Sequence, residues 1–251
     1  MKRIYPNLLI TGTPGTGKTQ LCERIIDQLP DDLKSEFSIM NLSDFAKTNK
    51  CLDGYDYELE CDIIDEEVVE QKLIEKFDPS GGGDGEGPDS ARPRHGGIIM
   101  DYHGADLIPK QLLDKVFVLR CNNSILYDRL SKRNYPQKKI EMNLECEIFQ
   151  SIKDEAIDAF GPEMVIEMNS EDENDCESNI REIIKWIYKW MNYQEKKEGA
   201  KVNGDEARVK SKSHEGNVYN EASVNHEGKL DAKQNGDEDV EDDGPDEVDV
   251  E

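Results

Sequence analysis

The chain has 251 residues, a formal net charge of −25 and 35% hydrophobic residues. This length is enough for one or two domains with a buried core, but the low hydrophobic content indicates that part of the chain does not fold. The acidity argues against binding of nucleic acid or anionic membranes over a broad surface, although a local basic site stays open.

Targeting signals and cysteine frameworks are not expected either. No apolar run approaches the roughly 20 residues of a membrane helix, and no small-residue cleavage site follows the apolar start, so we expect neither a membrane span nor a secretory signal. The six cysteines form no C-x-x-C pair. This spacing favours reduced thiols over a zinc or disulfide framework.

The first predicted element is a buried strand over residues 4–11, which leads into a glycine-rich loop. The loop, Gly12–Thr19, reads GTPGTGKT and fits the phosphate-binding pattern G-x-x-x-x-G-K-[ST]. A helix predicted over Lys18–Leu29 completes the strand–loop–helix context. Loop N–H groups and the helix N-terminus would bind phosphate, with Lys18 on the β- and γ-phosphates and the Thr19 hydroxyl on Mg²⁺. The alternative is an ordinary glycine-rich turn.

A second strand is predicted over Phe37–Leu42, followed by a short helix over residues 43–47. Asp53–Glu60 is acidic and aromatic. It fits a plain polar surface loop, but it also lies where nucleotide kinases place the acceptor site. Helical periodicity resumes over Asp65–Phe77. Residues 78–96 are rich in Gly, Pro, Asp and Ser, which predicts a flexible insertion.

Three more strands and three more helices alternate in the remaining folded part. The strands are predicted over 97–101, 115–120 and 165–168, and the helices over 123–133, 145–160 and 180–193. Alternation of this kind predicts a doubly wound α/β fold, a five-stranded parallel sheet with helices on both faces. Ligands bind beyond the carboxyl ends of such strands, where the loop and Asp101 would lie.

The periodic pattern ends near Tyr193. Residues 237–251 contain ten acidic residues and no basic one. We therefore predict a kinase domain over 1–193 and a disordered acidic tail over 194–251, because such a segment cannot bury enough apolar surface to offset its ordering entropy. The tail could serve only solubility, imitate nucleic acid or bind a basic partner.

Two polar residues follow the third predicted strand. Asp101 ends that strand like a Walker B acid, which holds Mg²⁺ directly or through water, although a turn or capping acid is the alternative. His103 is either an ordinary hydrogen-bonded core histidine or a residue that orients water or phosphate. Cations at 129–139 would neutralise charge on a transferred phosphoryl group, but Arg129 and Arg133 could equally form a solvated helix face.

A GTPase is the chief competing interpretation. Asp101–Gly104 fits the string D-x-x-G, which a guanine-reading N-K-x-D should follow. The nearest comparable string, Asn49–Asp53, has the wrong spacing and precedes Asp101. We therefore set this interpretation aside.

Taken together, the motifs resemble the adenylate kinase isoenzyme 6 family over about residues 1–191, apart from the insertion. The residues that carry the resemblance are Gly12–Thr19, Asp53–Asp56, Ile64–Glu66, Asp101–Asp106, Val116–Arg120, Leu126–Leu130, Arg133–Tyr135, Lys138–Lys139, Cys146–Gln150 and Trp186. The resemblance implies the reaction ATP + AMP ⇌ 2 ADP, together with ATP hydrolysis.

Site residues follow from the same resemblance. It implies ATP contacts at Gly15, Gly17, Lys18, Thr19 and Gln20, with Arg133 reaching ATP from a lid at about 132–142. It implies that Lys18, Asp101, His103 and Arg133 are catalytic and that Thr19 and Asp101 hold Mg²⁺. The acceptor-binding region would be about 41–64.

The resemblance also implies a cellular role. The expected partner is a small-subunit ribosomal protein within a pre-ribosomal particle, at the maturation of pre-rRNA, in nucleus and cytoplasm. We expect a monomer that does not itself read a nucleic-acid sequence. Ordinary adenylate kinases hold AMP with an arginine after the third strand, and Asp101–Lys110 contains none. The alternative is therefore an ATP-gated assembly factor with little AMP kinase activity.

Overall fold

A computed structural model describes residues 3–77 and 96–212, with side chains up to residue 197. The chain divides into two units, residues 1–203 and 204–251. The first unit contains every element below apart from the end of the last helix. In the described part no helix is both long enough and apolar enough to cross a bilayer.

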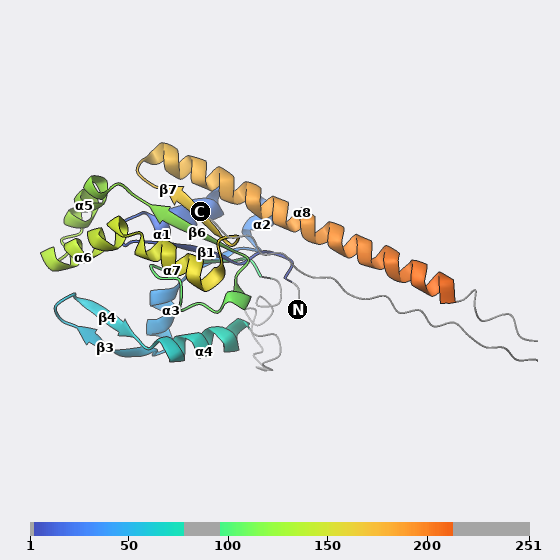
Figure 1. The fold of residues 1–251 in the computed structure, drawn as a ribbon, viewed down its shortest axis with the longest axis horizontal. Coiled ribbons are helices and arrows are strands. Elements are labelled where there is room, and N and C mark those ends of the chain that lie inside the picture. The colour runs from blue at the N-terminus through green and yellow to red at the C-terminus, as the bar shows by residue number, and fades with distance from the viewer. Residues whose placement is uncertain (1–2, 78–95, 213–251) are drawn as a thin grey trace, which may run out of the picture. The chain divides into compact units, whose positions relative to one another are not determined.

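Five strands form one parallel sheet (Figure 1). The strands are β1 (Leu8–Gly12), β2 (Ser38–Asn41), β5 (Ile98–Asp101), β6 (Lys115–Arg120) and β7 (Val165–Asn169), in the order β2-β5-β1-β6-β7. β1 and β5 are buried along their whole length, which is why each appears in the sequence as an apolar run rather than an alternating pattern. The predicted five-stranded α/β fold is confirmed.

The strand register brings distant residues together. β1 pairs with β5 so that Ile10 lies opposite Asp101, and β2 pairs with β5 so that Asn41 also lies opposite Asp101. The loop that leaves β1 therefore starts beside the acid that ends β5, at the carboxyl edge of the sheet.

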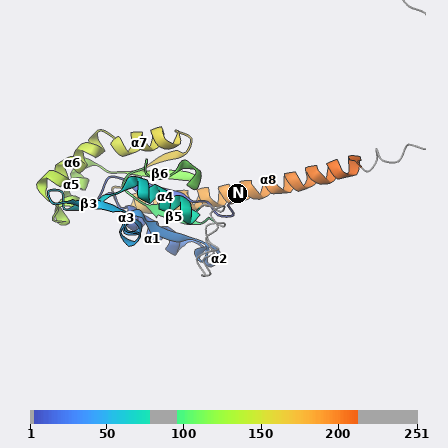
Figure 2. The same ribbon diagram turned by 90° about the horizontal axis from the view of Figure 1, so that it is seen from below.

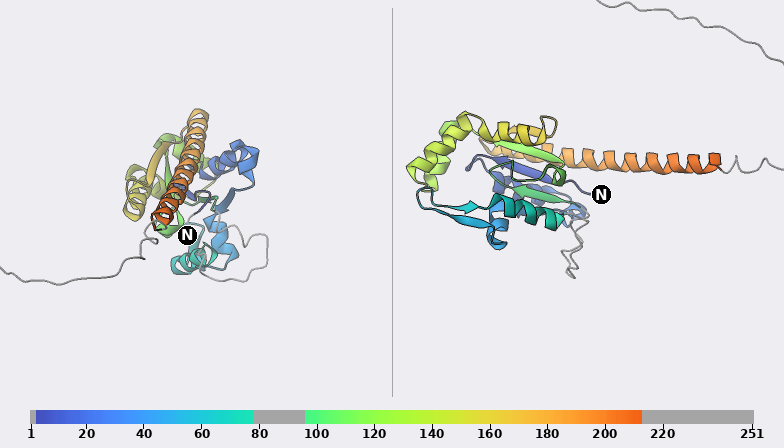
Figure 3. Two further views of the ribbon diagram at one scale, coloured as in Figure 1. Left: turned by 90° about the vertical axis from the view of Figure 1, so that its right-hand side faces the viewer. Right: turned by 60° about the horizontal axis from the view of Figure 1, so that its bottom comes forward.

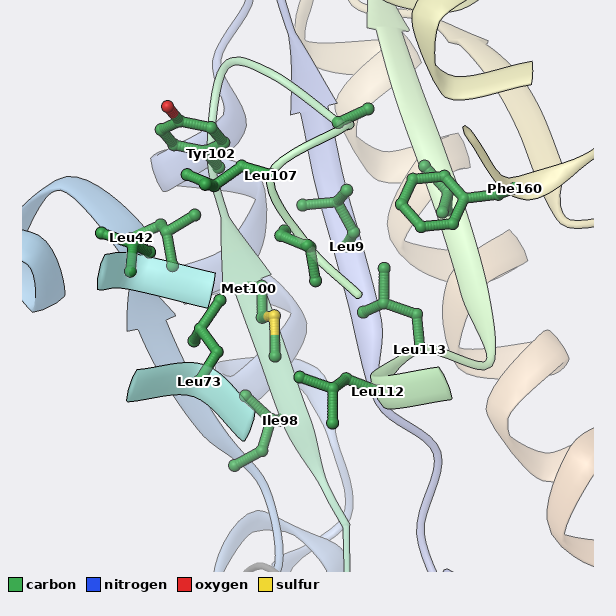
Figure 4. Packing of buried hydrophobic residues seen from close by; sticks show 14 of the residues in the cluster. Leu9, Leu42, Leu73, Ile98, Met100, Tyr102, Leu107, Leu112, Leu113 and Phe160 are labelled. Carbon is green, nitrogen blue, oxygen red and sulfur yellow. The ribbon is translucent and has the colours of Figure 1, made fainter. Parts of the chain in front are cut away.

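Helices cover both faces of the sheet. They are α1 (Lys18–Gln28), α2 (Asp31–Lys34), α3 (Leu42–Thr48), α4 (Glu66–Phe77), α5 (Asn123–Lys132), α6 (Gln137–Ile148), α7 (Ser151–Phe160) and α8 (Glu173–Lys212), with a 3₁₀ helix at Lys110–Leu112. On one face Leu9, Leu73, Met100 and Phe160 pack together beneath α4 and α7 (Figure 4). On the other face Ile10 packs with residues of α1 and α8.

One long predicted helix is two helices. We predicted a continuous helix over 145–160, which is wrong: α6 ends at Ile148 and α7 begins at Ser151. Gln150 adopts a left-handed conformation with φ 58°, which breaks the helix. The apolar residue Phe149 continues the hydrophobic spacing across the break, which is why the sequence pattern predicted one helix. In the structure Phe149 is 71% exposed and belongs to neither packed face.

The acidic and aromatic segment Asp53–Glu60, for which we predicted no strand, is part of a hairpin. β3 (Leu52–Asp56) and β4 (Cys61–Ile64) pair antiparallel in a separate two-stranded sheet. The hairpin lies near α6 at one end of the domain (Figures 2 and 3). It occupies about half of the range 41–64 that we predicted for acceptor binding, and α3 occupies much of the rest.

The last helix is longer than predicted. α8 spans Glu173–Lys212, whereas the apolar pattern gave only 180–193. Residues 194–212, which we expected to be disordered, are helical, since Glu, Lys and Ala favour helix without an apolar stripe. Residues 78–95 and 213–251, which hold most of the predicted insertion and tail, lie outside the described residues.

Candidate active site

The loop between β1 and α1 needs glycine at two positions. Gly12 has φ +136°, and a Cβ there would lie 2.4 Å from the Leu119 carbonyl oxygen. Gly15 has φ +99°, and a Cβ there would lie 2.9 Å from a methyl carbon of Leu126. L-residues rarely adopt these angles, so the curled path of the loop depends on these glycines. The predicted loop therefore has the backbone form that cradles phosphate.

Lys18 points back into this loop. Its Nζ donates to the carbonyl oxygen of Gly12 at 2.7 Å and to that of Thr13 at 3.1 Å. Burial lowers the pKa of Lys18 to about 8; the Asp101 carboxylate opposes this shift and Arg133 adds to it. An anion in the loop would favour the charged ammonium, so Lys18 is placed to bind phosphate.

Asp101 is the centre of a small oxygen-rich cluster. Its Oδ2 accepts a hydrogen bond from Thr19 Oγ1 at 2.5 Å and one from Asn41 Nδ2 at 3.1 Å. The carboxylate is buried, with 3% of the residue exposed. The two residues that we predicted for Mg²⁺, Thr19 and Asp101, are thus in direct contact, and Asn41 holds the carboxylate in place.

This donor set fits Mg²⁺ bound together with a nucleotide. Mg²⁺ prefers oxygen ligands and is commonly held by one or two protein groups plus substrate phosphates and water. In the described residues no group of three or more His, Cys, Asp or Glu could hold a metal by itself. Thr19 and Asp101 therefore suit a metal ion that arrives with phosphate oxygens.

His103 and Arg133 line the cavity that also contains the phosphate loop and Asp101. His103 is open to the cavity, but the surrounding walls and the Lys18 ammonium lower its pKa to about 4, against the opposing effect of Asp101. The imidazole is therefore neutral near pH 7. Arg133 follows the last residue of α5. Arg129 donates to the carbonyl oxygen of Gly15 at 3.4 Å and to those of Ser170 and Glu171, so it ties the phosphate loop to the loop between β7 and α8.

A cavity of about 990 Å³ joins these parts. All eight residues that we predicted as ATP-binding, catalytic or metal-binding line it: Gly15, Gly17, Lys18, Thr19, Gln20, Asp101, His103 and Arg133. Their individual roles stay predictions. The hairpin and α6 supply the opposite wall, through residues that include Tyr55, Asp62 and Lys139.

The hairpin tip is bonded to α6. Lys139 Nζ donates to the carbonyl oxygen of Leu59 at 2.7 Å, and Lys138 Nζ lies 2.5 Å from a carboxylate oxygen of Glu58. These contacts join the predicted lid to the predicted acceptor region. The hairpin and α6 are therefore held together along this part of the cavity.

Cations gather in the cavity of this acidic chain. Lys18, Lys47, Arg133 and Lys139 all line it. Lys47 is on α3 and pairs with Asp62 of the hairpin at 3.0 Å. Sequence reasoning singled out Lys139 only as part of a basic stretch and missed Asn41 and Lys47. Asn41 is the last residue of β2, one position before the end of the predicted strand Phe37–Leu42, so the rule that ligands lie at strand ends could have found it.

Comparison with known proteins gives consistent matches. The family model described as AAA domain matches residues 8–150. The adenylate kinase isoenzyme 6 homolog of Saccharomyces cerevisiae is 38% identical over 190 residues, which cover 76% of this chain and 86% of the relative. The homolog of Drosophila melanogaster is 37% identical, with 74% and 94% covered. That of Dictyostelium discoideum is 39% identical, with 76% and 96% covered.

Sequence similarity, sheet order and loop geometry agree with one another. The matched range begins at the first residue of β1 and includes the loop, the hairpin, Asp101 and the lid segment. The chain is a P-loop nucleotide kinase of the adenylate kinase type and belongs to the adenylate kinase isoenzyme 6 family.

Proposed function

We propose that the chain transfers the γ-phosphoryl group of ATP to AMP in the presence of Mg²⁺, forming two ADP, and that it also hydrolyses ATP. The observation that carries this proposal is the cavity of about 990 Å³ that joins the phosphate loop to the hairpin and α6. Its volume is at the upper end of the roughly 300–1,000 Å³ of small-molecule sites, which suits two nucleotides held end to end.

The donor half would hold ATP through the loop. Backbone N–H groups of the loop and the Lys18 ammonium would bind its phosphates. Thr19 and Asp101 would hold Mg²⁺, which neutralises phosphate charge when it is bound. Arg133, from the turn before α6, would stabilise charge on the transferred group.

The acceptor half faces the hairpin. The attacking group is a phosphate oxygen of AMP, which is already anionic near pH 7, so transfer needs positioning and charge neutralisation rather than a general base. No arginine is present between Asp101 and Lys110 to hold that phosphate. Lys47 and Lys139 are the cations on the hairpin side of the cavity that could do so.

ATP hydrolysis would use water in place of AMP. His103 is two residues from Asp101 and neutral near pH 7, since its pKa is about 4. A neutral imidazole can accept a hydrogen bond from water and orient it toward the γ-phosphate. Loss of His103 should therefore lower hydrolysis more than transfer.

A coupled assay of ADP formation tests this function. We expect ADP production that depends on ATP, Mg²⁺ and AMP together, a slower ATP-only rate, and loss of both rates in Lys18→Met. Lys72→Met is the matched control, because Lys72 is on α4, pairs with Glu75 and does not line the cavity. ADP formation that is unaffected by AMP would contradict the kinase proposal and leave only the ATPase.

We also propose that the chain acts in maturation of the small ribosomal subunit, in the nucleus and cytoplasm, by binding a small-subunit ribosomal protein. The net charge of −25 supports this proposal, because it suits a basic partner. Purified full-length protein should capture such a protein at about 0.15 M salt, with a difference between ATP and no ATP that Lys18→Met abolishes. Capture of no ribosomal protein in either condition would contradict it.

A further inference from the structure

We propose that Glu147 is a positioning residue that fixes the phosphate loop through the hydroxyl of Thr13 and ties the loop to the lid helix α6. This inference rests on the proposed binding of ATP in the loop. Glu147 does not contact any of the residues predicted to bind ATP. It acts on one of them, Lys18, through the side chain of Thr13.

Glu147 is a buried acid with every carboxylate oxygen in use. The residue is 3% exposed. Its Oε2 accepts a hydrogen bond from Thr13 Oγ1 at 2.5 Å, and its Oε1 accepts from Arg120 Nε at 2.6 Å and from the Cys121 backbone N–H at 3.0 Å. Burial of a carboxylate is costly unless it is paired and hydrogen-bonded, and this one is both.

The local helix does not favour an acid at this position. Glu147 is in the last turn of α6, which ends at Ile148. Negative charge near a helix C-terminus opposes the helix dipole and is unfavourable. The contacts beyond the helix, to Thr13 and Arg120, therefore account for a carboxylate here.

Thr13 is the residue through which Glu147 reaches the nucleotide site. Thr13 is 1% exposed, and its carbonyl oxygen accepts hydrogen bonds from Lys18 Nζ at 3.1 Å and from Thr16 Oγ1 at 2.9 Å. The hydroxyl of Thr13 donates to Glu147, and the carbonyl oxygen of Thr13 accepts from Lys18. The bond to Glu147 therefore holds in place the residue whose carbonyl group orients Lys18. Release of the hydroxyl would free the loop to change shape when no phosphate is present.

The contact between Arg120 and Glu147 anchors the C-terminal end of the lid helix α6. Arg120 binds the Glu147 side chain and also donates from Nη2 to the Glu147 carbonyl oxygen at 2.8 Å. The other half of α6 carries Lys139, which lines the cavity and contacts the hairpin. One helix therefore spans from the phosphate loop to the closing contact, with its C-terminal end fixed to the loop.

A purely structural ion pair is the competing interpretation, and the chain offers a matched control for it. Arg120 also pairs with Glu167 at 3.0 Å, and Glu167 is 40% exposed at its side chain. Both acids neutralise Arg120, but only Glu147 contacts the loop. Glu167→Gln thus removes one negative charge from Arg120, and from Lys153, which pairs with Glu167 at 2.7 Å, while the Thr13 contact stays intact.

Calorimetric titration of the full chain with ATP and Mg²⁺ tests the role. Thr13→Val, which keeps the side-chain shape without the hydroxyl, should raise the Kd for ATP about tenfold, the effect of one charge-assisted hydrogen bond. Thr13→Ser should bind within twofold of wild type, and Glu167→Gln should bind like wild type. Thr13→Val should have a smaller effect in a Glu147→Gln background, because the charged partner is already gone.

Each outcome separates the possibilities. Equal ATP binding by wild type and Thr13→Val, equal losses in Thr13→Ser and Thr13→Val, or fully additive effects with Glu147→Gln would overturn the positioning role while ATP binding by wild type stands. A wild type that binds no ATP would instead reject the proposed nucleotide site, and this role with it. If Glu147→Gln does not fold, the three single variants at Thr13 and Glu167 still decide the question.

Discussion

Removal of the Lys139 ammonium group should open the cavity, whereas removal of the Lys138 ammonium group should have little effect. Lys139 Nζ donates to the Leu59 carbonyl oxygen at 2.7 Å in a part-buried contact and lies 4.8 Å from the ring centre of Tyr135. Lys138 pairs with Glu58 at 2.5 Å, but these side chains are 55% and 66% exposed. Adjacent lysines thus bind one hairpin tip in different surroundings.

The different surroundings of Lys139 and Lys138 set the free energy that each contact contributes. A hydrogen bond from a charged donor contributes about 1.5–3 kcal/mol, and we take the lower end because the contact is only part-buried. That value corresponds to roughly a tenfold change in an equilibrium. An exposed ion pair contributes about 0.2–1 kcal/mol, which is at most about fivefold.

The KM for AMP at saturating ATP measures closure over the acceptor. We expect Lys139→Met to raise this KM about tenfold, based on the preceding energy. It should also raise the ratio of ATP hydrolysis to transfer, because an open cavity admits water. Lys138→Met should change the KM by less than fivefold, and Lys139→Arg should restore most of the loss. Equal effects of Lys138→Met and Lys139→Met, or an unchanged KM in both, would refute the reasoning.

Three further changes test other parts of the structure. Asp101→Asn keeps an oxygen for the Thr19 and Asn41 contacts but removes the charge, so kcat should fall at least about 100-fold while the melting temperature barely changes. The Kd for ATP should be flat below pH 8 and rise by up to about tenfold per pH unit above it. The reason is that free protein loses the Lys18 proton with a pKa of about 8, and ATP binding must restore that proton. Calorimetry in buffers of different ionisation enthalpy should therefore show proton uptake on ATP binding near pH 8.5. Phe160→Ala should lower the free energy of unfolding in urea by about 3–5 kcal/mol, since Phe160, the last residue of α7, is fully buried.

The results that would contradict these three predictions differ in kind. An Asp101→Asn variant with near-normal kcat would remove the acid from the metal site. A Kd for ATP that stays constant to pH 10, or that changes equally in Lys18→Arg, would show that the Lys18 proton is not linked to binding. A loss of under about 1 kcal/mol in Phe160→Ala would mean that the face beneath α7 repacks.

The sheet and the phosphate loop could be predicted because their signals are local. β1 and β5 are continuous apolar runs, and the loop is defined within the eight positions Gly12–Thr19. The adjacency of the loop and Asp101 followed from the general rule that parallel strands meet ligands at their carboxyl ends. Local pattern and global topology agree in this part of the chain.

Other features depend on contacts between distant residues. Asn41 meets Asp101 across 60 positions, and Thr13 meets Glu147 across 134. Neither spacing has a sequence pattern. The hairpin was missed for a different reason: β3 is almost wholly exposed, so it lacks the alternation that marks a half-buried strand.

The central claim is that one cavity binds a phosphate donor and a phosphate acceptor together. The most direct measurement is a calorimetric titration of the full chain with P¹,P⁵-di(adenosine-5′) pentaphosphate, which joins two adenosines through five phosphates. We predict binding at one molecule per chain, competition by ATP and by AMP, and loss of binding in Lys18→Met. Absence of heat with well-folded protein, or competition by ATP alone, would contradict the account.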